Sequence, residues 1–209
     1  MSELDWSQLY KHRKSVAQKF GELWQLPIEK RYHAILMPLG KAGTTLLEIG
    51  AGDRSLQNRL AKQWSDFTYK SCDIDESHPH DFFDINDVTG QYDLICLFEI
   101  IEHLDLKQAS HMIQKCQTLL KPGGKIVVTT PNIYYPPGFM RDVTHCTAWC
   151  YDELGGFLEL AGLKVTTIHR LYHDSIAKQL VRRYLFYPVF RVMNFDFARQ
   201  IIVVAEKPQ

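Results

Sequence analysis

The residues best suited to chemistry stand in one short run, Glu99-Ile100-Ile101-Glu102-His103. If a helical turn begins near Glu99, positions i, i+3 and i+4 share a face, so Glu99, Glu102 and His103 converge. Two carboxylates and an imidazole suit Mg²⁺ or another divalent ion that keeps open coordination positions. Such an ion acidifies and orients a bound hydroxyl group. The alternative is a helix start that carries acids because of the helix dipole, with His103 bonded to a carbonyl group.

A later histidine, His145, is the second candidate for chemistry. It closes the run RDVTH, in a loop that we expect on the ligand-binding side of the fold. An imidazole there can be a metal ligand, a general base or a hydrogen-bonded structural group. The candidate catalytic residues are therefore His145 and His103. Cys146 and Cys150 follow closely, but no second pair stands near them to complete a zinc site, so we predict ordinary packing thiols.

A glycine turn with acidic neighbours, EIGAGD at residues 48–53, follows a short apolar segment. Glycine lets the backbone approach a ligand closely, and a following helix offers free N–H groups. Asp73, at the end of the next apolar segment, can accept hydrogen bonds from both hydroxyls of a ribose. Because the turn is acidic, it suits a cationic, ribose-bearing ligand better than a pyrophosphate. The alternative is a plain strand-to-helix turn with solvated acids.

Alternating strands and helices must position these residues. Apolar segments predict seven strands, at residues 45–49, 67–72, 82–85, 92–98, 125–130, 163–170 and 200–206. Amphipathic helices are predicted between them, among others at residues 106–120 and 151–161. This alternation indicates a doubly wound α/β fold, with a mostly parallel seven-stranded sheet and helices on both faces. In such a sheet the ligand lies beyond the carboxyl ends of the strands.

Two helical segments lie outside this alternation. Residues 1–43 are predicted to form a basic helical extension, and residues 44–209 the main domain. Residues 174–197 interrupt that domain before its last strand and are predicted to form a helical cap. Within it, residues 177–193 mix aromatic and aliphatic side chains with arginines. Such a stretch is typical of a segment that contacts a membrane or a lipid substrate, or of a cap helix packed on the sheet with its arginines directed outward.

Five motifs, in their order along the chain, resemble the class I S-adenosylmethionine-dependent methyltransferases over roughly residues 44–208. They are LLEIGAGD, SCDID, YDLICLFEIIEHL, LLKPGGKIVVTTPN and DELGGFLELAGLKV. The resemblance implies a Rossmann-like fold and S-adenosylmethionine as cofactor. The positions that it assigns to the cofactor are Glu48, Gly50 and Gly52 at the methionine part, Asp73 at the ribose, Asp84 near the adenine edge, and Glu99. Arg54 stands where the family has a third glycine, so it either crowds the cofactor or points outward.

The E-x-x-E-H run resembles two groups of this family. In the ubiquinone-biosynthesis O-methyltransferases the corresponding residues bind Mg²⁺, which implies Glu99, Glu102 and His103 as ligands. The small-RNA 3′-terminal 2′-O-methyltransferases add a later histidine, for which His145 is the candidate. We therefore expect O-methylation of a small-molecule, sugar or lipid-linked hydroxyl acceptor, with a divalent metal ion as candidate second cofactor. The alternatives are methylation of an RNA 3′ end and a non-catalytic partner subunit.

Charge and composition narrow the class of protein. The 209 residues include 24 basic and 24 acidic side chains, and this zero net charge disfavours a nucleic-acid partner. A hydrophobic fraction of 45% excludes a disordered chain. No apolar run reaches the roughly 18 residues of a membrane span, and the first residues lack the apolar core of a signal peptide. With five scattered cysteines, these features favour a cytoplasmic enzyme.

Overall fold

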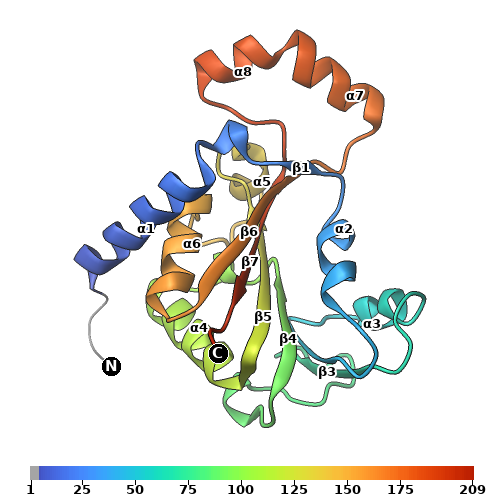
Figure 1. The fold of residues 1–209 in the computed structure, drawn as a ribbon. Coiled ribbons are helices and arrows are strands. Elements are labelled where there is room, and N and C mark those ends of the chain that lie inside the picture. The colour runs from blue at the N-terminus through green and yellow to red at the C-terminus, as the bar shows by residue number, and fades with distance from the viewer. Residues whose placement is uncertain (1–4) are drawn as a thin grey trace.

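A seven-stranded mixed sheet forms the centre of the protein in the computed structural model, which describes residues 5–209. Its order is β1-β6-β7-β5-β4-β2-β3. The strands are β1 (Ile28–Glu29), β2 (Thr45–Ile49), β3 (Thr68–Cys72), β4 (Tyr92–Phe98), β5 (Leu120–Pro131), β6 (Lys164–Leu171) and β7 (Gln200–Glu206). Every neighbouring pair is parallel except those of β7, which runs antiparallel to β5 and β6. The predicted doubly wound α/β fold is confirmed (Figure 1).

One predicted strand, at residues 82–85, is wrong. The segment contributes a single bridge between Phe82 and Cys72 and then enters a 3-10 helix, Ile85–Asp87. The chain turns because the backbone N–H groups of Asp81 and Phe82 both donate to the Ser71 carbonyl. The seventh strand is β1 instead, which comes from the N-terminal segment and pairs with β6 at the sheet edge.

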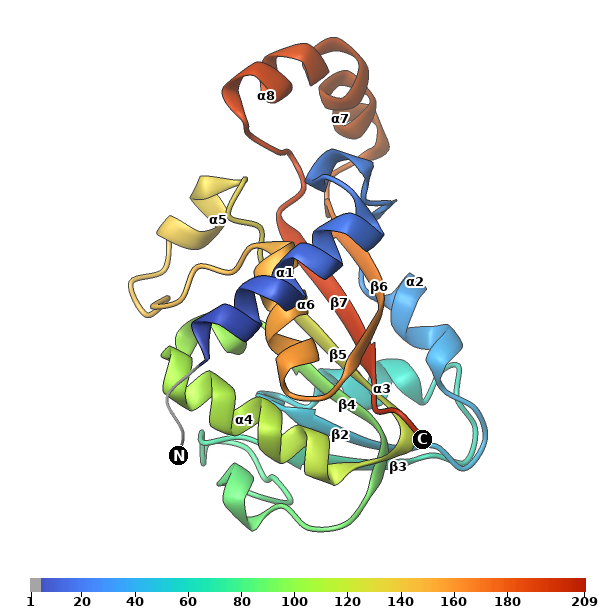
Figure 2. The ribbon, with the colours of Figure 1, turned by 60° about the vertical axis from the view of Figure 1, so that its left-hand side comes forward.

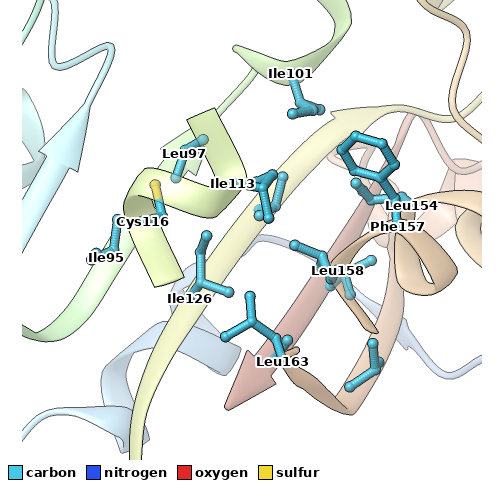
Figure 3. Packing of buried hydrophobic residues seen from close by; sticks show 14 of the residues in the cluster. Ile95, Leu97, Ile101, Ile113, Cys116, Ile126, Leu154, Phe157, Leu158 and Leu163 are labelled. Carbon is cyan, nitrogen blue, oxygen red and sulfur yellow. The ribbon is translucent and has the colours of Figure 1, made fainter. Parts of the chain in front are cut away.

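Helices cover both faces of the sheet (Figures 1 and 2). On one face lie α1 (Trp6–Phe20), α4 (Leu106–Leu119) and α6 (Tyr151–Leu160). The other face carries α2 (His33–Leu36) and α3 (Ser55–Leu60). Figure 3 shows the larger core, where Ile113 of α4 and Phe157 of α6 pack near Ile126 of β5. Burial of each such side chain contributes about 1.5–3 kcal/mol, which holds the two layers together.

A helical arm, which we define as residues 175–195, replaces the predicted cap. It contains α7 (Ile176–Leu180), a π-helical turn (Val181–Leu185) and α8 (Tyr187–Met193). These helices do not pack on the sheet: Figures 1 and 2 show the arm standing apart from the sheet layers, and nearly all of its residues are exposed. None of the helices in residues 5–209 has the length and apolar character that crossing a bilayer requires.

Helix α1 is fixed to the domain by α6. Arg13 Nε donates to Asp152 Oδ2 at 2.7 Å, and Arg13 Nη1 donates to Glu153 Oε1 at 2.7 Å. The two helices meet at glycines: a Cβ on Gly156 would lie 2.7 Å from the backbone nitrogen of Arg13. A Cβ on Gly155 would lie 2.9 Å from a methyl group of Val16. Only glycine therefore permits this close approach of the two helix backbones.

Replacing Gly156 by alanine should destabilise the protein even though alanine is the better helix former. The added methyl group meets the backbone of α1, which cannot rotate away, so we expect a loss of roughly 1–3 kcal/mol in the free energy of unfolding. Urea denaturation followed by circular dichroism measures it. Gly155→Ala, which meets a side chain instead, is the comparison and should cost less. A Gly156→Ala protein more stable than the wild type would contradict the packing described.

Candidate active site

The glycine turn after β2 has a backbone that requires glycine twice. Gly50 has φ +74°, and a Cβ there would lie 2.0 Å from Cδ1 of Ile100. Gly52 has φ +46° and donates its N–H to Asp73 Oδ2 at 2.7 Å. A Cβ on Gly52 would meet no atom within 4 Å, so open space lies above the turn. The turn thus offers a bare backbone to a ligand at the carboxyl end of β2.

Asp73 follows β3 and is held by the backbone on both sides of its carboxylate. Besides the bond from Gly52, its Oδ1 accepts a hydrogen bond from the N–H of Asp75 at 3.0 Å. Because β2 and β3 pair in parallel, the carboxyl ends of both strands reach the same sheet edge. The side chain is therefore oriented before any ligand arrives, which suits recognition of a ribose.

Arg54 takes the left-handed backbone conformation in place of a glycine, with φ +57°. Its Nη1 donates to the carbonyl of Pro79 at 2.9 Å, and its guanidinium lies 5.4 Å from the centre of the Tyr69 ring. The side chain is thus held against the loop that follows β3.

Glu48 and Asp84, which are also predicted to bind the cofactor, lie in contrasting surroundings. Glu48 is buried, with 6% of its surface exposed, and accepts a hydrogen bond from the Tyr69 hydroxyl. Burial raises the pKa of Glu48 to about 7. Asp84 is exposed and caps the 3-10 helix that follows it, because its Oδ1 accepts from the Asn86 N–H at 2.8 Å.

The helical turn considered near Glu99 begins two residues later, so Glu99 is not part of it. Glu99 has a left-handed backbone, with φ +56°, and the 3-10 helix that follows spans only Ile101–His103. The Thr129 hydroxyl donates to Glu99 Oε1 at 2.8 Å, which ties this carboxylate to β5. Burial raises the pKa of Glu99, and hydrogen bonds from Gln200 and Thr129 partly offset this effect.

A second segment, residues 144–149, is attached to this 3-10 turn by its backbone and side chains. The N–H groups of Cys146 and Thr147 both donate to the Glu102 carbonyl, at 2.9 and 3.0 Å. Trp149 Nε1 donates to the carbonyl of Ile101 at 3.2 Å. These bonds join parts of the chain more than 40 residues apart and carry His145 to the side chains of the turn.

Glu102, His103 and His145 form a cluster in which one ligand atom of each lies within 4.8 Å of the others. His145 Nε2 is 4.0 Å from Glu102 Oε1, and the two imidazole rings are 4.7 Å apart between centroids. Among the described residues no other group of three such side chains meets this criterion. Glu99, a predicted metal ligand, lies outside the cluster, and its role as a ligand stays a prediction.

Outer partners fix the tautomers of both histidines. His145 Nδ1 lies 2.8 Å from the carbonyl of Phe139, which only accepts, so this nitrogen carries the proton. The Thr144 hydroxyl donates to Asp142, so the Nδ1–H of His103 donates to Thr144 at 2.9 Å. Each neutral ring therefore keeps a free lone pair on Nε2, the arrangement that is typical of metal-ligating histidines.

The Glu102 carboxylate is unusual for a buried acid. The residue is fully buried, and within residues 5–209 neither carboxylate oxygen has a hydrogen-bond partner. Burial, with a further contribution from the charge of Glu99, raises the pKa of Glu102 to about 8. An orphaned buried carboxylate beside two imidazole lone pairs is suited to a cation or to proton transfer.

A cavity of about 330 Å³ opens beside Glu99. Arg141 and Arg199 line it, together with His173 and Tyr135. Arg199 Nη2 lies 3.1 Å from Asp174 Oδ1 at the base of the arm. His173 and Arg199 carry no motif that singles them out in the sequence, although both flank the 174–197 insertion, between the carboxyl end of β6 and the start of β7.

Comparison with known proteins defines the class. Residues 22–168 match the sequence profile of the family described as "Methyltransferase domain", and the chain belongs to that family. The fold agrees: a crystal structure of a SAM-dependent methyltransferase from Archaeoglobus fulgidus has a TM-score of 0.65 at 17% identity. That likeness covers 97% of this chain and 100% of the other. The chain thus has a methyltransferase domain with the fold of solved S-adenosylmethionine-dependent methyltransferases.

Two curated proteins are similar over shorter stretches. A probable S-adenosylmethionine-dependent methyltransferase of Mycolicibacterium smegmatis is 32% identical over 97 residues. A ubiquinone biosynthesis O-methyltransferase of Acinetobacter baylyi is 25% identical over 118 residues. Each match covers 44% of this chain, but only 36% of the first relative and 46% of the second. The chain therefore matches less than half the length of either relative.

The raised pKa of Glu48 has a measurable consequence for stability. Between the ordinary value of 4.5 and about 7, the folded state keeps a proton that the unfolded chain has lost. The free energy of unfolding of the ligand-free protein should therefore fall by about 1.4 kcal/mol per pH unit across this range from this group. The Glu48→Gln variant, whose side chain is neutral at every pH, should lack this part of the pH dependence of the free energy of unfolding.

Urea denaturation at about pH 5 and about pH 8 compares the two proteins. Glu76→Gln, at an exposed carboxylate, is the control for loss of one charge. If the wild type and Glu48→Gln lose the same stability between these pH values, burial does not raise the pKa of Glu48 as described.

Proposed function

We propose that the enzyme transfers the methyl group of S-adenosylmethionine to a hydroxyl oxygen of a small-molecule, sugar or lipid-linked acceptor, assisted by a divalent metal ion. The observation that carries this proposal is the Glu102 carboxylate, which is buried without a hydrogen-bond partner among residues 5–209. It lies 4.0 Å from Nε2 of His145 and in one cluster with His103. A purely structural carboxylate would be expected to find a partner on burial.

The cofactor is best accommodated by the glycine turn. Gly50 and Gly52 leave backbone space at the carboxyl end of β2, and the oriented Asp73 carboxylate can accept the ribose hydroxyls. Glu48 lies in the strand that leads into this turn, near Asp53 and Asp73, so the turn has the acidic character that favours a sulfonium ion. We assign Asp84 to the adenine edge only on the family resemblance.

The residues of the cluster fit a divalent ion. Glu102, His103 and His145 would hold it. Divalent ions such as Mg²⁺ and Mn²⁺ bind carboxylate and imidazole ligands, although they differ in their preference between oxygen and nitrogen. The bound ion would supply a Lewis acid that acidifies and orients the acceptor hydroxyl. The contacts of Thr144 and Phe139 hold the two rings in the required tautomer.

In the reaction, a bond forms between the acceptor oxygen and the methyl carbon while the carbon–sulfur bond of the sulfonium breaks. The cofactor leaves as the neutral thioether, and the hydroxyl proton must go to a base. With an ion on His145 Nε2, the acidified hydroxyl would release that proton to water. Without an ion, the same Nε2 can accept the proton, because its Nδ1 is already protonated toward the Phe139 carbonyl.

The acceptor is expected in the cavity beside Glu99. Arg141 and Arg199 line this cavity, so an acceptor with a carboxylate or phosphate group near its hydroxyl fits it best. An RNA 3′ end is the second candidate, because His145 joins the cluster as the fourth ligand of the small-RNA methyltransferases would.

Asp73→Asn should weaken the binding of S-adenosylmethionine at least about tenfold, because the amide replaces a charged acceptor of the ribose hydroxyls. Isothermal titration calorimetry measures the affinity. Asp75→Asn is the matched control, two residues further along the same loop, and should retain wild-type affinity. Equal affinities of the Asp73→Asn variant and the wild type would remove Asp73 from the cofactor site.

Divalent ions should stabilise the protein through Glu102. After chelator treatment, Mg²⁺ or Mn²⁺ is expected to raise the melting temperature of the wild type but not of Glu102→Gln, which lacks the anionic ligand. Differential scanning fluorimetry measures this. His111→Ala, at an exposed histidine of α4, should respond like the wild type. An equal response of the wild type and Glu102→Gln would contradict a metal ion at the cluster.

An activity assay with the wild type and His145→Ala distinguishes cofactor binding from methyl transfer. Labelled S-adenosylmethionine is offered with catechols, sugars and short RNAs, each with and without an anionic group. His145→Ala should lower turnover at least about 100-fold with little change in cofactor affinity. Turnover at the wild-type rate would remove His145 from the catalytic residues. Cofactor binding without turnover on any hydroxyl acceptor would favour the non-catalytic alternative.

A further inference from the structure

The arm exposes more apolar surface than any role inside the fold explains. Between residues 175 and 195, every residue is exposed except Gln179, Arg182 and Phe190, which are partly buried. The exposed fraction reaches 88% at Val192, and the large apolar residues that stand exposed are Ile176, Leu180, Val181, Tyr184, Leu185, Phe186, Tyr187, Val189, Val192, Met193 and Phe195. Scattered single apolar residues are normal on a protein surface, but a continuous set marks a binding surface.

The charge on the arm has one sign. Lys178, Arg182, Arg183 and Arg191 lie within residues 175–195, and that stretch contains no aspartate or glutamate. Arg182 contacts Asp174 at the base of the arm, and Arg191 lies 3.2 Å from Glu22. Within residues 5–209, Lys178 and Arg183 form no ion pair. The arm therefore presents unneutralised positive charge beside its apolar side chains.

The base of the arm is anchored to the domain by buried polar side chains. Arg170 Nη1 lies 2.9 Å from Asp196 Oδ1, and Asn132 Nδ2 donates to Asp196 Oδ2 at 2.9 Å, all three being buried. A cavity of about 620 Å³ separates Tyr184 and Phe190 of the arm from the N-terminal segment near Trp24. The arm thus stands off the domain at the end of the sheet where β6 finishes (Figures 1 and 2).

We propose that residues 175–195 dock on the surface of a bilayer that contains anionic lipid. Short amphipathic helices with basic and aromatic side chains lie in the plane of the interface, with apolar groups between the acyl chains and cationic groups at the phosphates. A second copy of this chain is disfavoured as the occupant, because two arms of the same positive charge repel each other.

The location of the arm connects this surface to the cavity beside Glu99. Asp174, at the base of the arm, pairs with Arg199, and Arg199 lines that cavity. Docking therefore places the opening of the cavity close to the interface, where a lipid-linked acceptor would be found. The docking itself rests on the arm alone and stands or falls independently of the proposed methyl transfer.

Flotation with vesicles tests the proposal on the whole protein. The wild type should float with vesicles of phosphatidylcholine and phosphatidylglycerol, and bind vesicles of phosphatidylcholine alone at least about tenfold more weakly. Leu185→Asp with Val192→Asp should abolish flotation, because both side chains are exposed and meet the interface. Trp6→Asp, an equally apolar exposed site on α1, is the control and should float like the wild type.

Charge is tested separately. Lys178→Glu with Arg183→Glu should lose binding to the anionic vesicles, whereas Lys11→Glu with Lys14→Glu, at exposed positions of α1, should retain it. Melting temperature and binding of S-adenosylmethionine check that each variant is folded, whatever its turnover. The proposal would be overturned if the protein floated with neither type of vesicle or equally well with both. It would also be overturned if the arm formed dimers or protein complexes without lipid.

Discussion

Parallel pairing of β2 with β3 and β4, and of β4 with β5, is the constraint on which the rest of the site depends. Parallel strands end at the same edge of the sheet, so the residues that follow each strand are brought together although they lie far apart in the sequence. The glycine turn, Asp73 and the run from Glu99 to His103 all follow strand ends of this kind. Hydrogen bonds between backbone groups in this ladder thereby determine which side chains can share one ligand.

The cluster at this edge contains a buried carboxylate, although carboxylates are normally solvated. Burying Glu102 without a hydrogen bond costs several kcal/mol in the ionised state, and its pKa of about 8 expresses that cost. The surrounding structure can impose it because the segment 144–149 is bonded to the 3-10 turn at several points. A bound cation or a proton would neutralise the buried charge of Glu102 and remove this desolvation cost. The burial that destabilises the ligand-free protein therefore favours binding of a cation and transfer of a proton at this residue.

The N-terminal segment and the arm are both additions to the sheet and its covering helices, but only the first is packed into the core. At one edge, β1 extends the sheet and α1 closes over α6 through two glycines, which makes the N-terminal segment part of the packed core. At the end of the sheet, the arm is anchored by the buried Arg170–Asp196 pair but leaves its apolar side chains in contact with solvent. One addition thus buries apolar surface within the molecule, and the other presents it.

Local patterns were sufficient to predict most of the fold, because strand length, apolar runs and glycine turns are properties of neighbouring residues. The doubly wound sheet, six of its seven strands and the site residues at strand ends follow from them. Residues 82–85 failed as a strand because side-chain and carbonyl contacts with Ser71 turned the chain, and β1 was missed because two residues make no pattern. The motifs along the chain were sufficient to recognise the methyltransferase family, because each motif is made of neighbouring residues. The meeting of His145 with Glu102, in a cluster that leaves Glu99 outside, and the exposure of the arm are visible only in the folded protein, because such contacts join residues whose separation along the chain carries no local signal.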